Sequence, residues 1–309
     1  MELEELVATS QSLAYIRKGM IETIPCEPVS ARKELEVLGF SDLLAIYMNW
    51  IDRLIEPRPR QTRFSPGFWD ERAAAQVAPI MVIAERSEKG EDLKAYLSPR
   101  VNSSGYAPDA KTRSGLITGG KDRALNAYGI HHLHLVPGNA KGKRSGESTD
   151  LLFVRVRRDH MVFVMCGGHS SFDDGTLRQA MADLELASGT HIRGIVGVYP
   201  EMTAREGEAL SRQGINTVTA SNGFSTMPSY LSTALTSLRH RRHADEIVDV
   251  IERLEPLTRS DEGRVEICRE FGLPRSEAAR FGWALNYSTL LLVEETSRKA
   301  VAQVPYRNI

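Results

Sequence analysis

The run LLFVRVRRDHMVFVMC at residues 151–166 constrains the fold of this chain more than any other feature. Two segments rich in β-branched and aromatic residues lie on either side of the charged triplet Arg157-Arg158-Asp159. Such segments favour strands, and a short polar interruption between them favours a tight turn. We therefore expect an antiparallel hairpin here, with the neighbouring segments arranged around its sheet.

Histidines gather around this expected hairpin. Five of the eight histidines lie between residues 128 and 172, and three of them, His131, His132 and His134, occupy one apolar run that we expect to be a strand. Side chains of a strand alternate between its two faces, so His132 and His134 share a face and His131 points to the other. His169 follows the second hairpin strand after two glycines, which relax the backbone and let its imidazole turn toward a cleft.

Length and charge narrow the class of protein. A chain of 309 residues exceeds the usual size of one domain, and we expect two or three modules. The net charge of −1 argues against a generally basic nucleic-acid-binding surface. Residues 111–169 nevertheless contain ten Lys or Arg against four Asp or Glu, a surplus of six positive charges around the histidines. Such a basic region attracts polyanions, although a merely hydrated basic face would have the same composition.

The cysteines and the amino terminus indicate a compartment. Cys26, Cys166 and Cys268 are odd in number and far apart, which is typical of reduced thiols. The first residues, MELEEL, are acidic where a signal peptide is basic, and apolar runs are shorter than the roughly 18 residues that span a bilayer. We expect a cytoplasmic protein with no membrane contact.

The order of expected elements predicts an α+β fold with three modules. We expect a mainly helical N-terminal module (1–110), a core module (111–188) and an α/β C-terminal module (189–309). The expected helices are 2–18, 41–55, 69–84 with a break near Pro79, 120–128, a helix capped by Asp173 or Asp174 that ends near 187, one opened by the capping box Thr203–Glu206, and 243–254. The expected strands are 61–65, 130–136, the hairpin, 192–198 and 215–220 as a βαβ unit, and a hairpin over 289–304.

Common nucleotide-binding and hydrolase signatures are missing from the sequence. There is no GxxxxGK[ST], GxGxxG, HExxH or GxSxG motif. One remaining possibility is a metal site, because His132, His134 and His169 offer three nitrogen ligands for zinc and Asp150 a fourth ligand. This pattern leaves open a His-ligated, metal-dependent hydrolase.

A second possibility is metal-free acid-base chemistry on RNA. Cleavage of an RNA phosphodiester needs a base for the 2′-OH proton, an acid for the 5′-oxygen, and cations for the negative charge that develops on phosphorus. Histidine suits both proton roles because its unperturbed pKa is about 6.5. The histidines of this segment are candidates for these roles. The candidate phosphate-binding cations are Lys141, Lys143, Arg144 and Arg155.

The arrangement HLHLVPG…STDLLFVRVRRDHMVFVMCGGHSSF, within residues 112–172, resembles the C-terminal half of RelE/YafQ-type mRNA interferase toxins. In this comparison His134 matches the histidine of the family's strand, and Asp150 the aspartate before the hairpin. His169 matches the histidine at the end of the hairpin, which takes part in proton transfer, and Phe172 the aromatic residue that follows. The spacing between His169 and Phe172 is one residue shorter than in the YafQ version, and the loop 137–149 is longer.

The resemblance implies a small RelE-like antiparallel sheet packed on helices, and an endoribonuclease that uses neither a metal nor a cofactor. It implies RNA as substrate, free or ribosome-bound, and an antitoxin-like partner protein. His134 and His169 would transfer protons, with His132 as a third candidate and Asp150 orienting or tuning one histidine. Arg155, with Lys143 or Arg144, would contact phosphate. A non-catalytic nucleic-acid or protein-binding module on a RelE-like fold is the alternative that remains beside the metal-dependent hydrolase.

Overall fold

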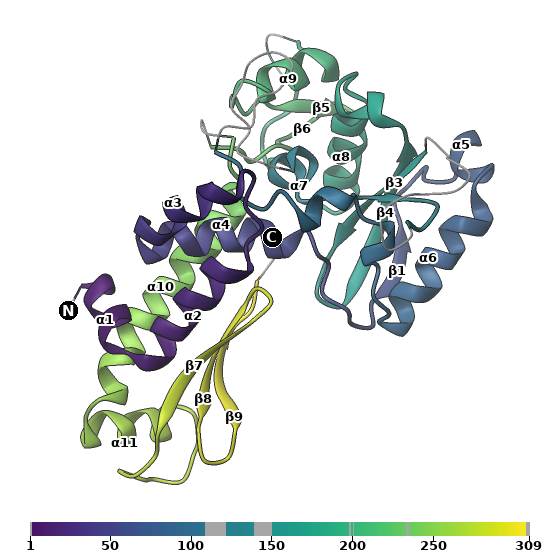
Figure 1. The fold of residues 1–309 in the computed structure, drawn as a ribbon. Helices are drawn as coiled ribbons and strands as arrows, with labels where there is room; N and C mark the ends of the chain where they lie inside the picture. Colours follow the sequence, from purple (N-terminus) through teal and green to yellow (C-terminus); the bar gives the residue numbers. More distant parts are fainter. Residues whose placement is uncertain are drawn as a thin grey trace. The chain divides into compact units, whose positions relative to one another are not determined.

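The computed structural model describes residues 2–108, 122–138, 150–197, 199, 201–232 and 235–306. These residues form eleven α-helices and three small β-sheets, so the predicted α+β class is confirmed (Figure 1). The chain divides into two compact units. Unit 1 combines Met1–Asp52, Ser104–Pro108 and His240–Arg307, and unit 2 is built from Arg53–Ser103 and Asp109–Arg239. These boundaries differ from the three consecutive modules that the sequence predicted, because both ends of the chain contribute to unit 1.

Unit 1 packs helices from both ends of the chain beside a three-stranded sheet. The predicted helix 2–18 is two helices, because Ser10 has an extended backbone (φ −96°, ψ 117°) that ends one and starts the next. The C-terminal hairpin is confirmed, and the sequence missed the strand before it, β7, which contacts α2. The elements are α1 (Leu3–Thr9), α2 (Gln11–Thr23), the short 3₁₀ helix Val29–Ala31, α3 (Arg32–Val37), α4 (Phe40–Asp52), α10 (Leu238–Thr258, within this unit from His240), α11 (Asp261–Glu270), β7 (Phe281–Asn286), β8 (Thr289–Glu294) and β9 (Lys299–Val304).

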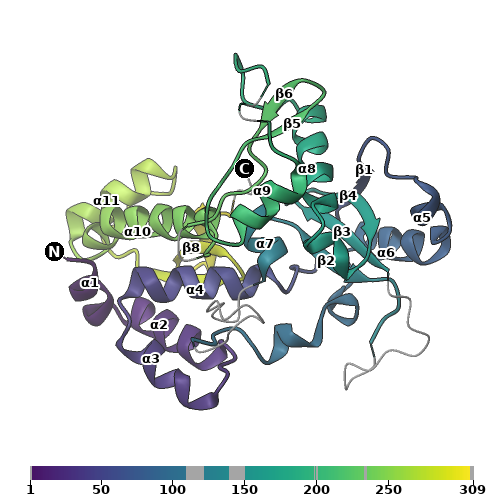
Figure 2. The ribbon, with the colours of Figure 1, turned by 90° about the horizontal axis from the view of Figure 1, so that it is seen from above.

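Unit 2 is organised around a mixed four-stranded sheet with the order β1-β4-β3-β2 (Figure 2). The predicted hairpin is confirmed, since β3 (Leu151–Val156) and β4 (His160–Gly167) are antiparallel neighbours. The histidine strand β2 (His131–His134) pairs antiparallel with β3. The early strand β1 (Gln61–Phe64) lies parallel to β4, so the sheet is not purely antiparallel.

Helices cover both faces of this sheet, and each face has its own apolar core. On one face, residues of α5 (Glu71–Ala74), α6 (Val77–Lys89) and the 3₁₀ segments Lys94–Tyr96 and Pro99–Asn102 pack on Leu133, Leu152 and other strand residues. On the opposite face, α7 (Arg123–Tyr128) and α8 (Thr176–Ala187) pack on Leu151 and Phe153 (Figures 1 and 2). A strand buried on both faces is largely apolar, which explains the hydrophobic character of β3, where Arg155 is the one charged residue.

Two helix boundaries in unit 2 differ from the predicted positions. The expected helix 69–84 is interrupted between Ala74 and Val77, and Pro79 lies in the first turn of α6, where its missing N–H leaves no intrahelical bond unmade. The helix after the hairpin has Gly175 at its N-cap position, while the Asp174 carboxylate accepts a hydrogen bond from the Thr176 N–H at 2.8 Å. The break near Pro79 is confirmed, whereas α6 continues to Lys89, five residues past the predicted end.

The predicted βαβ unit in the C-terminal part of unit 2 is wrong. The capping box at Thr203 is present and opens α9 (Ala204–Ser211), but β5 (Thr219–Ser221) pairs antiparallel with β6 (Phe224–Thr226) in a short hairpin. The described part of the run 192–198 forms only an isolated bridge between Val196 and Phe224. Gly194 and Gly197 have positive φ angles of 79° and 74°, which interrupt an extended strand.

Candidate functional site

The candidate site lies at one end of the unit 2 sheet, where three strands meet in register. His134, the last residue of β2, pairs with Leu151 at the start of β3, and Leu151 pairs with Gly167 at the end of β4. Paired residues share a face of a sheet. The predicted alternation is also observed, because His131 is 4% exposed among buried residues while His132 and His134 are only partly buried.

A β-bulge brings the end of β4 to the face that carries His134. The register between β3 and β4 shifts between Phe153 and Val154, and Val164 is passed over on β4. Without this extra residue, the alternation along β4 would turn Gly167 to the opposite face. A Cβ at Gly167 would lie 3.1 Å from the ring of Phe153, which confirms that Gly167 faces the α8 side of the sheet.

Three histidines and one aromatic ring gather at this end of the sheet. The ring centres of His132 and His134 are 6.4 Å apart, and those of His134 and His169 are 6.3 Å apart. Phe172 packs edge-on against His132 with ring centres 5.3 Å apart, and its ring lies 6.3 Å from His169. His169 is exposed, so the cluster opens to solvent at this residue. The structure thus brings together the three histidines that the sequence singled out.

Asp122, which sequence reasoning did not single out, lies beside His132. Its carboxylate caps α7 by accepting a hydrogen bond from the Leu125 N–H at 3.1 Å. Its second oxygen lies 4.0 Å from Nδ1 of His132, a contact that becomes an ion pair when the imidazole is protonated. An N-cap aspartate is readable from sequence, but its nearness to a histidine on β2 depends on how α7 packs against the sheet.

The turn that carries His169 is anchored by charged residues. It is a 3₁₀ helix, His169–Phe172, and Asp173 directly after it binds Arg123 at 3.4 Å and also Arg212. Arg123 in addition pairs with the buried carboxylate of Glu208. Burial, followed by the Arg212 cation, lowers the pKa of Arg123 to about 10, so it remains charged at neutral pH. Arg123 therefore ties the His169 turn to the helix whose N-cap faces His132.

Asp150 holds an arginine from a segment that precedes the predicted core module. Its Oδ1 lies 2.7 Å from Nε and 2.6 Å from Nη2 of Arg72, and its Oδ2 accepts a hydrogen bond from Gln76 at 3.1 Å. The Arg72 side chain is 43% exposed, whereas that of Asp150 is 16% exposed. Arg72 also approaches the end of β4, since a Cβ on Gly168 would lie 3.0 Å from its Nη2. No motif in the sequence connects Arg72 with residues 78 positions away.

Cys166 lies near these residues and is not suited to nucleophilic chemistry. It is 2% exposed, and burial, followed by the negative charge of Asp150, raises its pKa to about 11. At neutral pH the sulfur is therefore a neutral thiol, and the thiolate is the reactive form. All three cysteines of the chain are buried and free, in agreement with the predicted reduced state.

Of the predicted phosphate-binding cations, only Arg155 lies within the described residues, and its side chain is buried. Arg155 is 8% exposed, and burial, followed by the cations Arg157 and Arg239, lowers its pKa to about 10, with Glu185 as a nearby carboxylate. This burial does not favour contact between Arg155 and a substrate. Lys141, Lys143 and Arg144 lie outside the described residues.

Within the described residues, no group of three or more His, Cys, Asp or Glu side chains is arranged to hold a metal ion. Among the same residues, every helix is too short or too polar to cross a bilayer.

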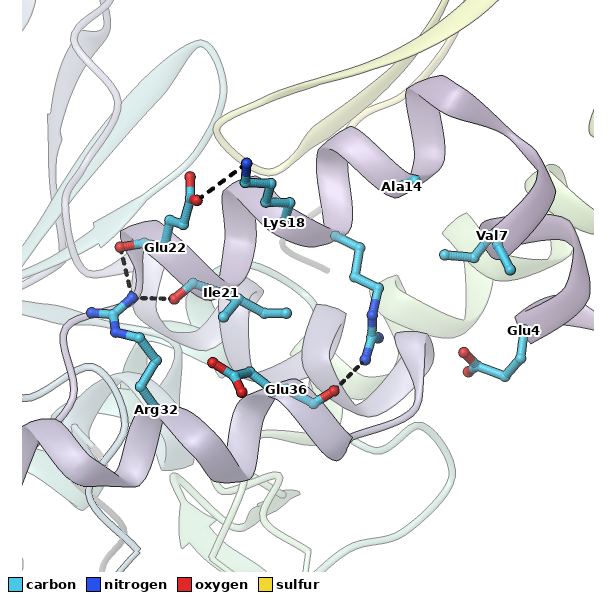
Figure 3. A pocket seen from close by; sticks show the side chains of 10 residues that line it. Glu4, Val7, Ala14, Lys18, Ile21, Glu22, Arg32 and Glu36 are labelled. Atoms are coloured by element: carbon cyan, nitrogen blue, oxygen red, sulfur yellow. Dashed lines mark hydrogen bonds and ion pairs between the residues drawn. The ribbon is translucent and has the colours of Figure 1, made fainter.

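A separate hollow lies in unit 1 between α1, α2 and α3 (Figure 3). Its two arginines are bound to backbone carbonyls, Arg17 to those of Glu36 and Leu38, and Arg32 to that of Glu22 at 2.8 Å and to that of Ile21. Lys18 and Glu22 on its rim form an ion pair at 3.7 Å. Because these charges already have partners, the hollow offers less chemistry than the histidine cluster.

No protein-family model matches the chain, and searches of curated proteins and of solved structures likewise return no match.

Proposed function

We propose that this protein is an endoribonuclease that cleaves RNA by metal-independent acid-base catalysis at the histidine cluster of unit 2. The observation that supports the proposal most directly is the spacing of the three imidazoles, with ring centres 6.3 and 6.4 Å apart and His169 open to solvent. Two hydrogen bonds in series span about 6 Å, so neighbouring rings are spaced to contact different oxygens of one phosphodiester.

In this proposal His134 and His169 are the proton-transfer pair. His134 is the last residue of β2, and His169 begins the 3₁₀ turn two residues after the end of β4; the two strands are held together through Leu151 of β3. One imidazole removes the proton of the 2′-OH while the other, in its protonated form, donates a proton to the leaving 5′-oxygen. The products are a 2′,3′-cyclic phosphate and a 5′-hydroxyl, so no external nucleophile is needed.

His132 and Phe172 lie next to this pair, His132 beside His134 and Phe172 beside His169. His132 contacts the Phe172 ring and faces Asp122, and its side chain is 18% exposed. This position suits a residue that fixes the geometry of His134, with which it shares a strand face. Phe172 is half-buried between His132 and Phe153, which leaves part of its ring for stacking against a nucleobase.

The resemblance to RelE/YafQ-type toxins supports a proposal for the RNA that is cleaved. It favours messenger RNA as the target, free or on the ribosome, and an antitoxin-like protein that neutralises the activity. The fold of the site, a small mixed sheet with helices on both faces, is compatible with such a substrate because the histidines are at its open end.

The test is incubation of the purified chain with total cellular RNA in excess EDTA, with and without translating ribosomes, followed by mapping of the new ends. We expect fragments with 2′,3′-cyclic phosphates from the wild type and none from the His134→Ala/His169→Ala variant. A matched control is His160→Ala, because His160 starts β4 on the same hairpin and lies beside Asp159 at the turn.

Three outcomes would contradict the proposal. Cleavage by the double variant would place the chemistry elsewhere, and cleavage that EDTA abolishes would indicate a metal-dependent hydrolase. Intact RNA in every sample, including those with ribosomes, would favour a binding module without catalysis. Equal loss in the His160→Ala control would indicate a defect in folding rather than in chemistry.

A further inference from the structure

Among the described residues, a cation from an earlier part of the chain, Arg72, reaches the sheet end that carries the histidine cluster. RNA cleavage passes through a phosphorane with added negative charge, and a fixed cation stabilises this state. Arg155, which the sequence favoured for this task, is 8% exposed. Arg72 on α5 is 43% exposed in its side chain and reaches the end of β4 beside Gly168. Building on the proposed nuclease activity, we propose that Arg72 binds the scissile phosphate of RNA.

The position of Arg72 follows from the register of the sheet. His134, Leu151 and Gly167 form one row across β2, β3 and β4, and the residues just beyond this row lie at the same sheet end. Asp150 immediately precedes Leu151, and Gly168 immediately follows Gly167. Arg72 comes from α5, on the face of the sheet opposite to that of His134, and its ion pair with Asp150 holds the guanidinium at the sheet end where His134 and His169 also lie.

The hydrogen bonds of the guanidinium leave one of its edges available. Nε and Nη2 both bind Oδ1 of Asp150, which occupies the side edge of the planar group. Within the described part of the chain, Nη1 of Arg72 makes no hydrogen bond. The end edge, formed by Nη1 and the second N–H of Nη2, has the fork geometry that binds two phosphate oxygens. Arg72 can bind a phosphate without giving up Asp150.

Asp150 and Gln76 are positioning residues in this scheme. The Asp150 carboxylate receives hydrogen bonds on both oxygens, from Arg72 on one and from Gln76 at 3.1 Å on the other. A carboxylate held at both oxygens fixes the plane of the guanidinium that it binds. The sequence resemblance gave Asp150 the task of orienting a histidine, whereas these contacts direct it toward orienting Arg72.

Gly168 provides the space that this arrangement needs. Its backbone angles (φ −113°, ψ −176°) are extended and open to any residue, so the conformation does not require glycine. A side chain would instead approach Nη2 of Arg72 at 3.0 Å. The missing Cβ therefore lets the guanidinium lie against the backbone directly before His169.

The experiment compares Arg72→Ala, Arg72→Lys and Asp150→Asn with the wild type. The matched control is Arg86→Ala, because the Arg86 side chain is also 43% exposed and also pairs with a carboxylate, that of Glu91 at 3.4 Å. One readout is kcat for a cleavable RNA. The other is the affinity, at several salt concentrations, for the same RNA fully 2′-O-methylated, which cannot be cleaved because its nucleophile is blocked. Thermal unfolding of each variant reports whether it is folded.

We expect Arg72→Ala to lower kcat by about 100-fold, as removal of one oxyanion donor does, and to reduce the salt slope of binding by about 0.7, as loss of one single-strand phosphate contact does. Millimolar guanidinium should restore part of the lost rate, which a purely structural defect would not allow. Arg72→Lys should keep the salt slope and lose most of the rate. Asp150→Asn should lower kcat with a smaller change in affinity.

The inference is overturned if Arg72→Ala matches the wild type in both readouts, or if Arg86→Ala loses as much. Failure of the proposed function looks different. If the wild type cleaves no RNA, the binding experiment still decides, since a reduced salt slope in Arg72→Ala alone supports the phosphate site and an unchanged slope rejects it.

Discussion

The two units each contain a group of histidines, and the two groups are built in opposite ways. In unit 2, His169 is exposed and His132 and His134 are partly buried on a strand face. In unit 1, His240 and His243 lie on α10 and are 3% and 2% exposed. The first group can meet a substrate, whereas the second is part of a protein interior.

Hydrogen bonding strengthens this contrast. Nε2 of His240 lies 2.9 Å from Asp52 and its Nδ1 lies 3.1 Å from the side-chain nitrogen of Asn49, so both ring nitrogens are engaged. His243 directs Nε2 at the carbonyl of Ser288 at 2.7 Å. The Tyr306 ring packs against both imidazoles, with ring centres 5.5 and 5.0 Å away. These histidines connect α4, α10 and the C-terminal sheet of unit 1.

The difference shows that residue type alone does not identify a catalytic histidine. A histidine whose nitrogens are saturated by the fold has no proton to exchange with a substrate, however close an aspartate lies. His240 with Asp52 has the composition of a catalytic dyad and the burial of a structural contact. Exposure, more than the presence of a carboxylate, separates the two groups.

The largest effect should come from single substitutions in the open group. We expect His134→Ala and His169→Ala each to lower the cleavage rate by about 10²- to 10⁴-fold, the usual contribution of one acid or base. The pH–rate profile of the wild type should be bell-shaped. One variant should lose its decrease at low pH, and the other its decrease at high pH. Loss of the same limb in both variants would mean that the two histidines are not an acid and base pair.

A smaller effect is expected in the buried group, and on stability instead of activity. His240→Ala removes a buried partner that Asp52 and Asn49 share, so the free energy of unfolding should fall by about 3 kcal/mol. The cleavage rate of the folded variant should equal that of the wild type. Urea unfolding measures the first quantity, and His160→Ala, at the start of β4, should change it less than His240→Ala does. An equally stable His240→Ala protein would contradict the structural role.

A third prediction concerns pH and His243. Burial lowers the pKa of His243 below the ordinary value of 6.5, an effect that outweighs the Ser288 carbonyl and Glu246, which raise it, while His240 lowers it further. The unfolded chain therefore binds this proton more readily than the folded chain. The stabilisation is complete above pH 6.5 and is lost as the pH falls through the lower, folded-state pKa.

Denaturant unfolding between pH 5 and 8 tests this prediction. We expect His243→Gln to be less stable than the wild type at pH 8 and to approach it at pH 5, because the variant has no proton to take up. Curves that remain parallel over this range would show that His243 does not contribute to the pH dependence.

The smallest effect on stability is expected for Gly168→Ala. The added Cβ displaces only the end of the flexible Arg72 side chain, so the free energy of unfolding should change by less than about 1 kcal/mol. The cleavage rate should fall several-fold because the guanidinium moves away from His169. An unchanged rate would show that the position of Arg72 tolerates this shift. Gly167→Ala is the contrasting variant, since its Cβ would lie 2.9 Å from Met165 and 3.1 Å from Phe153 and should destabilise the core.

Local patterns in the sequence predicted much of the site. The hairpin, the histidine strand and the face that His132 and His134 share all depend on alternation over a few residues, and all are present. The helix signals around α7, α8 and α9 were also local. The catalytic roles of these residues remain predictions.

The parts that the sequence did not predict depend on contacts between distant segments. The parallel pairing of β1 with β4 and the ion pair of Arg72 with Asp150 join residues separated by 99 and 78 positions. The bulge at Val164 contains no glycine that would have indicated it in the sequence. The missed strand β7 contains Gly282, a residue that is unfavourable inside a strand. Gly194 and Gly197 within an apolar run were the one local signal that the strand prediction for 192–198 overlooked.

The place of β1 at the edge of the sheet has a consequence for synthesis of the chain on the ribosome. Its parallel partner β4 is translated about a hundred residues later, which at roughly 5–20 residues per second is a delay of roughly 5–20 s. Over that interval α5 and α6 have no sheet to cover, and their apolar residues are available to chaperones. β4, the last strand of this sheet to emerge from the exit tunnel, therefore completes the sheet and brings Arg72 to the sheet end that carries His169 in a single late step.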